Sequence, residues 1–384
     1  MPANRLIFLD NQSTTPCDPR VVGAMLPWFS EQFGNPHSAE HQMGRDAEAA
    51  VETARAHVAA LIGAEAREVV FTSGATESNN IAIKGAARHA RRVGDERRRV
   101  ITVATEHKCV LESVADLAED GFDPVVLPVR RDGTLDLDRL AEALEVPTLL
   151  VSVMAVNNET GLIQDLAGIA AVVKRAGALF HTDAAQALGK ISLDVGVGID
   201  LMSVTAHKLY GPKGVGALYV RRRPRARVAA LFSGGNQERG LRSGTLATPL
   251  VVGFGEACRI AGQEMADEAA RISAIRDDLL ERLTLAIPGL SLNGSAVRVA
   301  GNLNITLPRS TAAAFMSEHP ELCISTGSAC SSAAIEPSYV LRAMGLDPDE
   351  AARSLRIGIG RFTCAADIDH AAAAFAAFHT LQQA

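Results

Sequence analysis

Two ionisable side chains stand at the ends of neighbouring apolar runs. Asp183 follows the run Ala178–Thr182, and Lys208 follows the run Leu201–Thr205 and precedes a Gly-Pro turn. Open α/β sheets bind ligands at the carboxyl ends of their strands, so both side chains are expected at one edge of a sheet. A lysine that forms a Schiff base and an acid that holds a pyridinium nitrogen are what pyridoxal phosphate chemistry needs. Taken singly, Asp183 also fits a helix N-cap and Lys208 a surface lysine.

A turn of small residues lies between another apolar run and a helix start. Ser73-Gly74-Ala75-Thr76 follows the run Val69–Thr72. Small residues let the backbone N–H groups of a helix N-terminus approach an anion, and the helix dipole favours negative charge there. The turn therefore suits a cofactor phosphate, with an ordinary N-cap as the alternative. The sequence has no G-x-x-x-x-G-K-[ST] loop, so this is not a Walker A site.

Two more polar residues follow apolar runs. His107 comes directly after Val100–Ala104 and Glu106, and Asn158 follows Leu149–Val156. An imidazole at a strand end could stack on a flat ring and move protons. The alternatives are a hydrogen-bonded structural histidine and, for Asn158, a turn without chemistry.

The C-terminal third holds a candidate nucleophile and a candidate carboxylate binder. Cys330 lies in Ser325–Ser332, a stretch of small polar residues, and an exposed thiol in such a loop favours a reactive role. Cys258 and Cys364 are expected to be buried and to pack as small apolar side chains. Arg356 stands inside a strand-like run, where a buried guanidinium needs a bidentate partner such as an amino-acid carboxylate. An ion pair within the protein is the alternative.

The elements that must position these residues alternate between strand and helix. Near-continuous apolar runs separated by amphipathic segments predict an α/β fold with a mostly parallel sheet covered on both faces. The run Val215–Val220 follows a tight turn and is a candidate antiparallel strand. After about Gly255 we expect one long helix, 256–285, and then a smaller α+β region. The predicted domains are 15–258, which binds the cofactor, and 259–384 together with 1–14.

Composition excludes several protein classes. The 384 residues carry a net charge of −6 and are 47% apolar, which excludes a disordered polyampholyte and disfavours general binding to nucleic acid or an anionic membrane. The apolar run at the N-terminus is too short for a signal peptide, and no run is long enough for a membrane helix. Six scattered cysteines without C-x-x-C fit a reduced, cytoplasmic protein.

Three charged or histidine-containing features are expected to have no role in this chemistry. The arginine clusters at 91–99 and 221–227 fit solvated faces, with docking of an acidic protein as the alternative. His37 and His41 are four residues apart, but Pro36 indicates a loop and H-E-x-x-H is absent. We therefore expect no resident metal.

Taken in order, these segments resemble the cysteine desulfurases, which are pyridoxal phosphate enzymes of the class V aminotransferase family (fold type I). The similarity covers nearly the whole chain, and many short segments carry it. They are 9–16, 33–38, 73–79, 105–107, 156–161, 183–186, 207–214, 237–245, the Cys330 loop, 336–341 and 361–363.

The resemblance implies a role for each candidate residue. Lys208 would hold pyridoxal 5'-phosphate through a Schiff base, and His107 would stack on its ring. Asp183 would bind the ring nitrogen. The phenolic oxygen would contact Gln186 and Asn158, the phosphate would contact Ala75, Thr76, Thr205 and His207, and Thr245 would reach the phosphate of a neighbouring subunit. Arg356 and Asn158 would bind the substrate carboxylate.

The resemblance also implies the reaction and the partners. A homodimer would convert L-cysteine to L-alanine, and the Cys330 thiolate would take the sulfur as a persulfide. An acceptor protein, such as an iron–sulfur scaffold, would then receive it, or the sulfur would serve thio-cofactor synthesis or tRNA thiolation. Cys330 is also a candidate ligand for a transferred iron–sulfur cluster. The Ser-rich Cys330 loop resembles the first group of the family, whose housekeeping members have a longer C-terminal segment.

Two alternatives stay open at this point. A selenocysteine lyase, or another pyridoxal phosphate lyase or aminotransferase, would use the same lysine and aspartate. A catalytically inert scaffold would bind an acidic partner through its arginine clusters, but the presence of Lys208, Asp183 and Cys330 disfavours it.

Overall fold

The computed structural model describes residues 5–327 and 337–382. Cys330 therefore lies outside the described residues. The strands are β1 (Ile7–Phe8), β2 (Val69–Thr72), β3 (Arg99–Val103), β4 (Asp123–Leu127), β5 (Thr148–Ser152), β6 (Leu179–Asp183), β7 (Leu201–Thr205), β8 (Gly216–Val220), β9 (Ser291–Leu292), β10 (Asn302–Thr306), β11 (Leu322–Cys323) and β12 (Ser354–Gly358). The α-helices are α1 (Pro19–Met25), α2 (Pro27–Ser30), α3 (Gln42–Leu61), α4 (Ala75–Val93), α5 (Lys108–Ala115), α6 (Leu137–Ala143), α7 (Leu166–Arg175), α8 (Thr248–Ala286), α9 (Ala312–Glu318), α10 (Tyr339–Ala343), α11 (Pro348–Ala352) and α12 (Ala365–Leu381).

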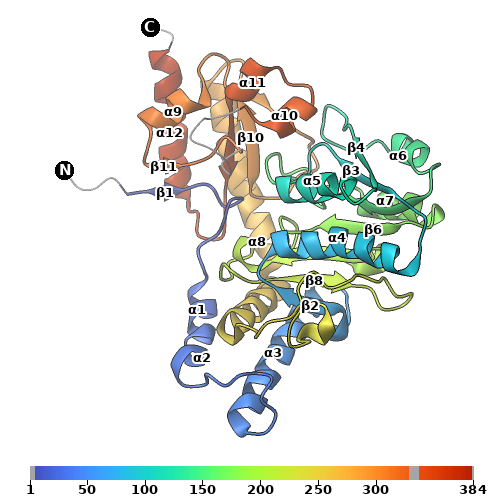
Figure 1. The fold of residues 1–384 in the computed structure, drawn as a ribbon. Coiled ribbons are helices and arrows are strands. Elements are labelled where there is room, and N and C mark those ends of the chain that lie inside the picture. The colour runs from blue at the N-terminus through green and yellow to red at the C-terminus, as the bar shows by residue number, and fades with distance from the viewer. Residues whose placement is uncertain (1–4, 328–336, 383–384) are drawn as a thin grey trace.

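A seven-stranded sheet forms the centre of the larger part of the molecule (Figure 1). Its strand order is β2-β8-β7-β6-β5-β3-β4. Strands β4, β3, β5, β6 and β7 pair in parallel, whereas β8 pairs antiparallel with both β7 and β2. The predicted α/β fold with a mostly parallel sheet is confirmed, and so is the antiparallel strand after the Gly-Pro turn.

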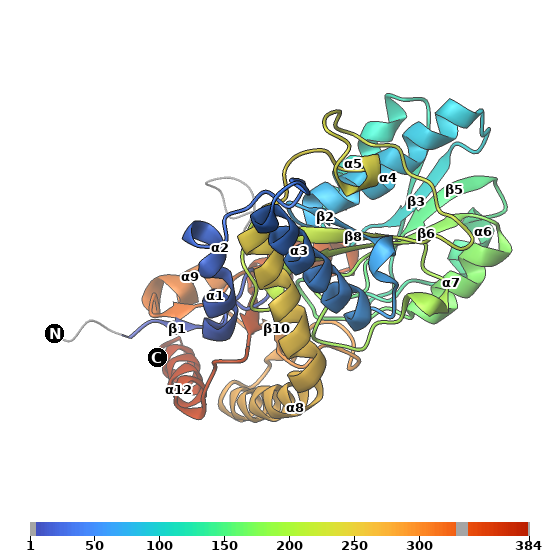
Figure 2. The ribbon, with the colours of Figure 1, turned by 90° about the horizontal axis from the view of Figure 1, so that it is seen from below.

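Helices cover both faces of this sheet, because alternate strand residues point to opposite sides. On one face, residues such as Val70, Val100 and Leu218 pack against α4 and α5. On the other face, residues such as Phe71 and Phe180 pack in the core that contains α3, α7 and the first half of α8. Figure 2 shows the two groups of helices on opposite sides of the strands.

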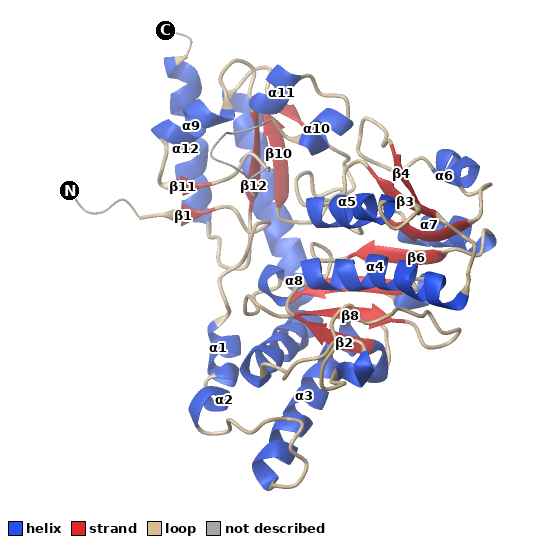
Figure 3. Ribbon diagram, in the orientation of Figure 1, coloured by secondary structure: helices blue, strands red, loops and turns tan. Residues whose placement is uncertain are grey.

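A second apolar core lies beside the first and is formed by both ends of the chain (Figure 3). It contains a three-stranded sheet of order β12-β10-β9 and the short parallel pair of β1 with β11. The second half of α8 and helices α9 and α12 pack on these strands, with Phe315 and Phe375 stacked at 3.9 Å between ring centroids. The N-terminal strand thus belongs to this core.

The long helix begins earlier than expected from the sequence. We predicted it over 256–285, but α8 starts at Thr248, with Pro249 in its first turn, where proline is well tolerated. Gly253 and Gly255 lie in the first turns of α8, and because glycine is a weak helix former they hid the start of the helix in the sequence. A Cβ on Gly253 would lie 2.5 Å from the Met25 sulfur, and one on Gly255 would lie 2.4 Å from Ala54. These glycines let α1 and α3 pack closely against α8.

Within residues 5–327 and 337–382, no helix has the length and apolar character needed to cross a bilayer.

Candidate active site

A cavity of about 480 Å³ opens where several strands of the central sheet end and α4 begins. Nine of the candidate residues line it, although they are spread over more than 130 positions of the sequence. They are Ala75, Thr76, His107, Asn158, Asp183, Gln186, Thr205, His207 and Lys208. The cavity can therefore hold a small flat molecule surrounded by charged and hydrogen-bonding groups.

Asp183 presents a buried carboxylate at the end of β6. Its Oδ1 accepts a hydrogen bond from the Ala185 N–H at 2.9 Å, and its Oδ2 accepts one from Asn79 Nδ2 at 2.7 Å. A turn follows β6, so the alternative of a helix N-cap is wrong. Both donors are neutral amides, which leave the negative charge available to a cation or protonated ring in the cavity.

Lys208 ends the short 3₁₀ turn Ala206–Lys208 that follows β7. Its Nζ donates to the backbone oxygen of Gln12 at 2.5 Å, and its side chain lines the cavity. The amine is thus held near the sheet edge and does not extend into solvent as a typical surface lysine does.

His107 lines the same cavity and also begins a helix. Its Nδ1 lies 3.2 Å from the Cys109 N–H and 3.0 Å from the Cys109 sulfur. The imidazole is therefore both a cap of α5 and part of the cavity wall. Burial lowers the pKa of His107, so the ring is neutral near pH 7. The pKa of the adjacent Cys109 thiol is raised by burial to about 12, so Cys109 remains a thiol.

The turn before α4 has the geometry of an anion site. Gly74 adopts φ 153°, a conformation open to glycine, and a Cβ there would lie 3.9 Å from Thr205 Oγ1. Glu77 accepts from the Ser73 N–H at 2.5 Å and pairs with Arg242 at 3.0 Å, which fixes the turn. The N–H groups at the start of α4 therefore face the cavity beside Thr205.

His207 lines the same cavity as this turn. Its Nδ1 lies 3.1 Å from Thr14 Oγ1, and burial together with Lys208 and Lys213 lowers the pKa of His207 to about 4. The ring is thus neutral near pH 7, and Lys208 and Lys213 supply positive charge around the cavity.

Arg356 and Asn158 meet at the junction of the two cores. Arg356 pairs with Asp10 at 2.7 Å and donates to the Asn158 backbone oxygen at 3.0 Å, so the predicted alternative of an ion pair within the protein is present. Among the residues described, Arg356 Nε and Asn158 Oδ1 are buried without a hydrogen-bond partner. These two groups retain the capacity to bind a ligand.

The structure does not bring every candidate to the cavity. Thr245 is exposed on a loop after β8, and it is not part of the cavity wall. Arg356 stands outside that wall, on β12. Asn79 was missed by sequence reasoning, because no sequence pattern links a helix amide to a carboxylate 104 positions away. His37 and His41 lie at a turn and a helix start, and no group of three metal-binding side chains occurs within the described ranges.

The residues around the cavity fit pyridoxal 5'-phosphate. The cavity offers an amine, a carboxylate with only neutral partners and the start of a helix, which match an aldehyde, a ring nitrogen and a phosphate. The unpaired Oδ1 of Asn158 adds a buried polar atom that a bound group could satisfy.

Comparison with known proteins agrees with this geometry. Residues 7–370 match the model of the family "Aminotransferase class-V". Human cysteine desulfurase is 51% identical over 371 residues, which cover 96% of this chain and 80% of the human protein. A solved NifS-like protein superposes with a TM-score of 0.90 at 32% identity, over 98% of this chain and all of the other. The structure "SspA in complex with cysteine" gives a TM-score of 0.82 at 36% identity, over 93% and 99% of the two chains.

The resemblance inferred from the sequence is thereby confirmed over almost the whole chain. This chain belongs to the class V aminotransferases and, among these pyridoxal phosphate enzymes, to the cysteine desulfurases.

Proposed function

We propose that this chain releases sulfur from L-cysteine, forms L-alanine and holds the sulfur as a persulfide on Cys330. An acceptor protein for iron–sulfur cluster assembly, or for another thiolation pathway, then takes the sulfur. One observation carries the proposal: Lys208 and Asp183 face a single cavity whose walls also hold His107 and the α4 turn. The SspA structure, described as a complex with cysteine, supports the choice of substrate.

In this proposal the residues of the cavity hold pyridoxal 5'-phosphate. Lys208 binds its aldehyde carbon, Asp183 its ring nitrogen and Gln186 its phenolic oxygen. The phosphate is held by the N–H groups at Ala75 and Thr76, and the side chains of Thr205 and His207 contribute to the same site. When bound, this cofactor acts as an electron sink for the substrate Cα.

Arg356 and Thr245, which stand outside the cavity wall, complete the site together with Asn158 on the wall. Arg356 and Asn158 take the cysteine carboxylate, and Arg356 supplies the charge and planar donors for that contact. Thr245 reaches the phosphate site of a neighbouring subunit in a homodimer, which accounts for its distance from the cavity of its own chain.

Lys208 and His107 transfer the protons. The free Lys208 amine would accept the proton from the substrate Cα. His107 is neutral near pH 7, so its imidazole is able to exchange a proton with the substrate.

Sulfur transfer takes place at the substrate Cβ–S bond. The Cys330 thiolate attacks the substrate sulfur, so an S–S bond forms while the Cβ–S bond breaks. The electron pair of the broken bond goes to the organic fragment, which takes up a proton and leaves as L-alanine. The products balance as alanine and one Cys330 persulfide.

We also propose the cellular setting and the division of the chain. A net charge of −6 fits a cytoplasmic homodimer that does not bind nucleic acid or membrane. The domains are 15–258 and 259–384 with 1–14. Two apolar cores support a division close to this boundary, since Val251–Ala261 pack in the first and Ile272–Leu283 in the second, so the change of core falls shortly after residue 258.

Matched cysteine variants test the proposal. Cys330→Ser should retain the bound cofactor and its visible absorbance but lose sulfide release from L-cysteine. The control is Cys364→Ser, which should keep both; Cys364 is exposed, so the prediction that it is buried was wrong. Borohydride reduction followed by peptide mass analysis should find the pyridoxyl adduct on Lys208. An adduct on another lysine, or full turnover by Cys330→Ser, would contradict the proposed roles.

A further inference from the structure

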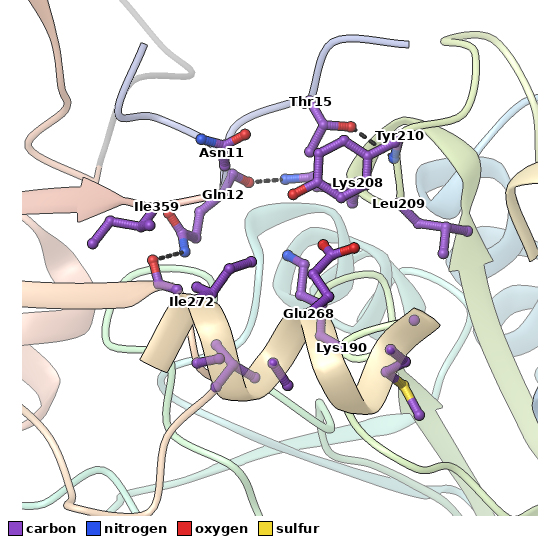
Figure 4. A pocket seen from close by; sticks show the side chains of 16 residues that line it. Asn11, Gln12, Thr15, Lys190, Lys208, Leu209, Tyr210, Glu268, Ile272 and Ile359 are labelled. Carbon is purple, nitrogen blue, oxygen red and sulfur yellow. Dashed lines mark hydrogen bonds between the residues drawn. The ribbon is translucent and has the colours of Figure 1, made fainter. Parts of the chain in front are cut away.

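A second, smaller cavity of about 40 Å³ lies behind Lys208 (Figure 4). Its wall includes Gln12, Lys190, Lys208, Tyr210 and Glu268. Figure 4 shows Lys190 and Glu268 pointing into it from the side opposite Gln12 and Lys208. The volume suffices for one or two water molecules, so the cavity is too small for a substrate. It brings a second lysine close to the proposed catalytic one.

A chain of hydrogen bonds connects the two lysines through Gln186. Lys190 Nζ donates to Gln186 Oε1 at 2.9 Å, and Gln186 Nε2 donates to the Gln12 backbone oxygen at 2.7 Å. That same oxygen accepts from Lys208 Nζ. Gln186 therefore lies between the two cavities and lines the larger one.

These contacts fix which way the Gln186 amide points. A protonated lysine only donates and a backbone oxygen only accepts, so the amide oxygen must face Lys190 and the amide nitrogen must face Gln12. The nitrogen carries two hydrogens, and the bond to Gln12 uses one of them. The second is left to donate to a ligand in the larger cavity.

We propose that Lys190 is a positioning residue for the cofactor: by donating to Gln186, it keeps that amide oriented as a donor toward the cofactor's phenolic oxygen. The inference deepens the proposed function and rests on it, because Gln186 needs this orientation only if the larger cavity holds pyridoxal phosphate.

The ionisation of Lys190 supports this role. Burial, Lys208 and Arg356 lower the pKa of Lys190 to about 7, while Glu268 opposes them. Glu268 on α8 also forms an ion pair with Arg361 at 2.7 Å, and this pairing reduces the extent to which Glu268 raises the pKa of Lys190. Below pH 7 the ammonium of Lys190 only donates. Above pH 7 the neutral amine can also accept a hydrogen bond, so the orientation of Gln186 then depends on the Gln12 backbone oxygen alone.

A double-mutant cycle measures whether Lys190 acts through Gln186. The variants are Lys190→Met, Gln186→Met and the double mutant, with Lys174→Met on α7 as an exposed control. The measured quantity is the dissociation constant of pyridoxal phosphate from the full chain, obtained by absorbance titration. We expect each single variant at pH 6.5 to bind about tenfold more weakly, and the double mutant to be no weaker than the weaker single.

The conservative variant Lys190→Arg separates positioning from packing. An arginine remains a donor at every pH tested, so the affinity should be restored and should no longer fall between pH 6 and pH 8, as we expect it to in the wild type. Melting temperatures of the cofactor-free variants show that each is folded.

Three results would overturn the inference: wild-type affinity in Lys190→Met, multiplicative effects in the double mutant, or a Lys190→Arg variant as weak as Lys190→Met. If the wild type carries its borohydride adduct on Lys208, such a result leaves the proposed function intact. The absence of that adduct in the wild type would instead remove the proposed function.

Discussion

Asn79 Nδ2 donates to Asp183 Oδ2 at 2.7 Å, and both residues are buried. The bond ties the first turns of α4 to the end of β6. The same helix start lines the cavity at the proposed phosphate site, so one element contacts both the carboxylate and that site. A shift of α4 would disturb both contacts together.

Asn79→Ala should weaken the binding of pyridoxal phosphate. The change leaves one oxygen of a buried carboxylate without its donor, which costs about 1–3 kcal/mol. Part of this cost appears as lower stability of the cofactor-free protein and part as weaker binding. Absorbance titration and thermal unfolding measure the two parts. The neighbouring Asn80→Ala, which loses only a bond to its own helix at Thr76, should change both by much less.

Arg55→Met should destabilise the protein by about 3–5 kcal/mol, because it leaves a buried charge unpaired. Arg55 and Glu238 form two bonds of 2.7 and 2.8 Å, and their side chains are only 3% and 2% exposed. Glu238 also accepts from the Phe71 N–H, which joins the loop after β8 to β2. Urea unfolding at pH 7 gives the free energy of unfolding.

The control for that experiment is Arg67→Met, because Arg67 pairs with Glu65 at an exposed position, where loss of the ion pair should change the free energy of unfolding very little. Adding Glu238→Gln to Arg55→Met should recover part of the loss. Equal destabilisation by Arg55→Met and Arg67→Met would show that the buried ion pair contributes no more to the free energy of unfolding than the exposed one.

His181 should make the protein less stable as the pH falls. It is buried in β6 between Ser152 and Ser203, and burial lowers its pKa to about 4. The unfolded chain, with a histidine pKa near 6.5, binds the proton more readily, so stability is lost as the pH drops below about 6.5. The expected loss between pH 7 and pH 5 is about 2 kcal/mol.

Urea unfolding of the cofactor-free wild type and of His181→Gln at both pH values tests this expectation. The glutamine can still bond to a serine hydroxyl but cannot gain a proton. The variant should therefore lose less stability on acidification, and an identical pH slope in both proteins would contradict the assignment.

Arg356→Lys should raise the KM for L-cysteine by about tenfold or more while lowering kcat less. A lysine keeps the charge but loses the planar pair of donors that matches a carboxylate. We propose that Arg356 binds the substrate carboxylate, a contact that is equally strong in the ground and transition states, so the loss is expected mainly in KM. Steady-state kinetics with L-cysteine measure both constants. A fall in kcat alone would place Arg356 in the chemical step instead.

The sequence predicted those features that depend on local pattern. The apolar runs predicted β6 and β7. Asp183, which ends β6, and Lys208, which follows β7, line one cavity as expected. The antiparallel β8 followed from a short turn, which is too short for a parallel crossover.

The features that were missed depend on contacts between distant segments. The start of α8 was obscured by Gly253 and Gly255, whose role is visible only when α1 and α3 pack against them. Lys190 looks like an ordinary lysine after a turn until its contact with Gln186 is known. No local pattern could have identified it.

The pairing of β1 with β11 has a consequence for synthesis on the ribosome. Ile7 pairs with Leu322, so β1 has to wait for a partner that is translated roughly 300 residues later. At about 5–20 residues per second, that delay is roughly 15 to 60 s. The core around the central sheet can form during this interval, whereas the exposed strand of the nascent chain remains open to a chaperone or to aggregation until the last third of the protein has been made.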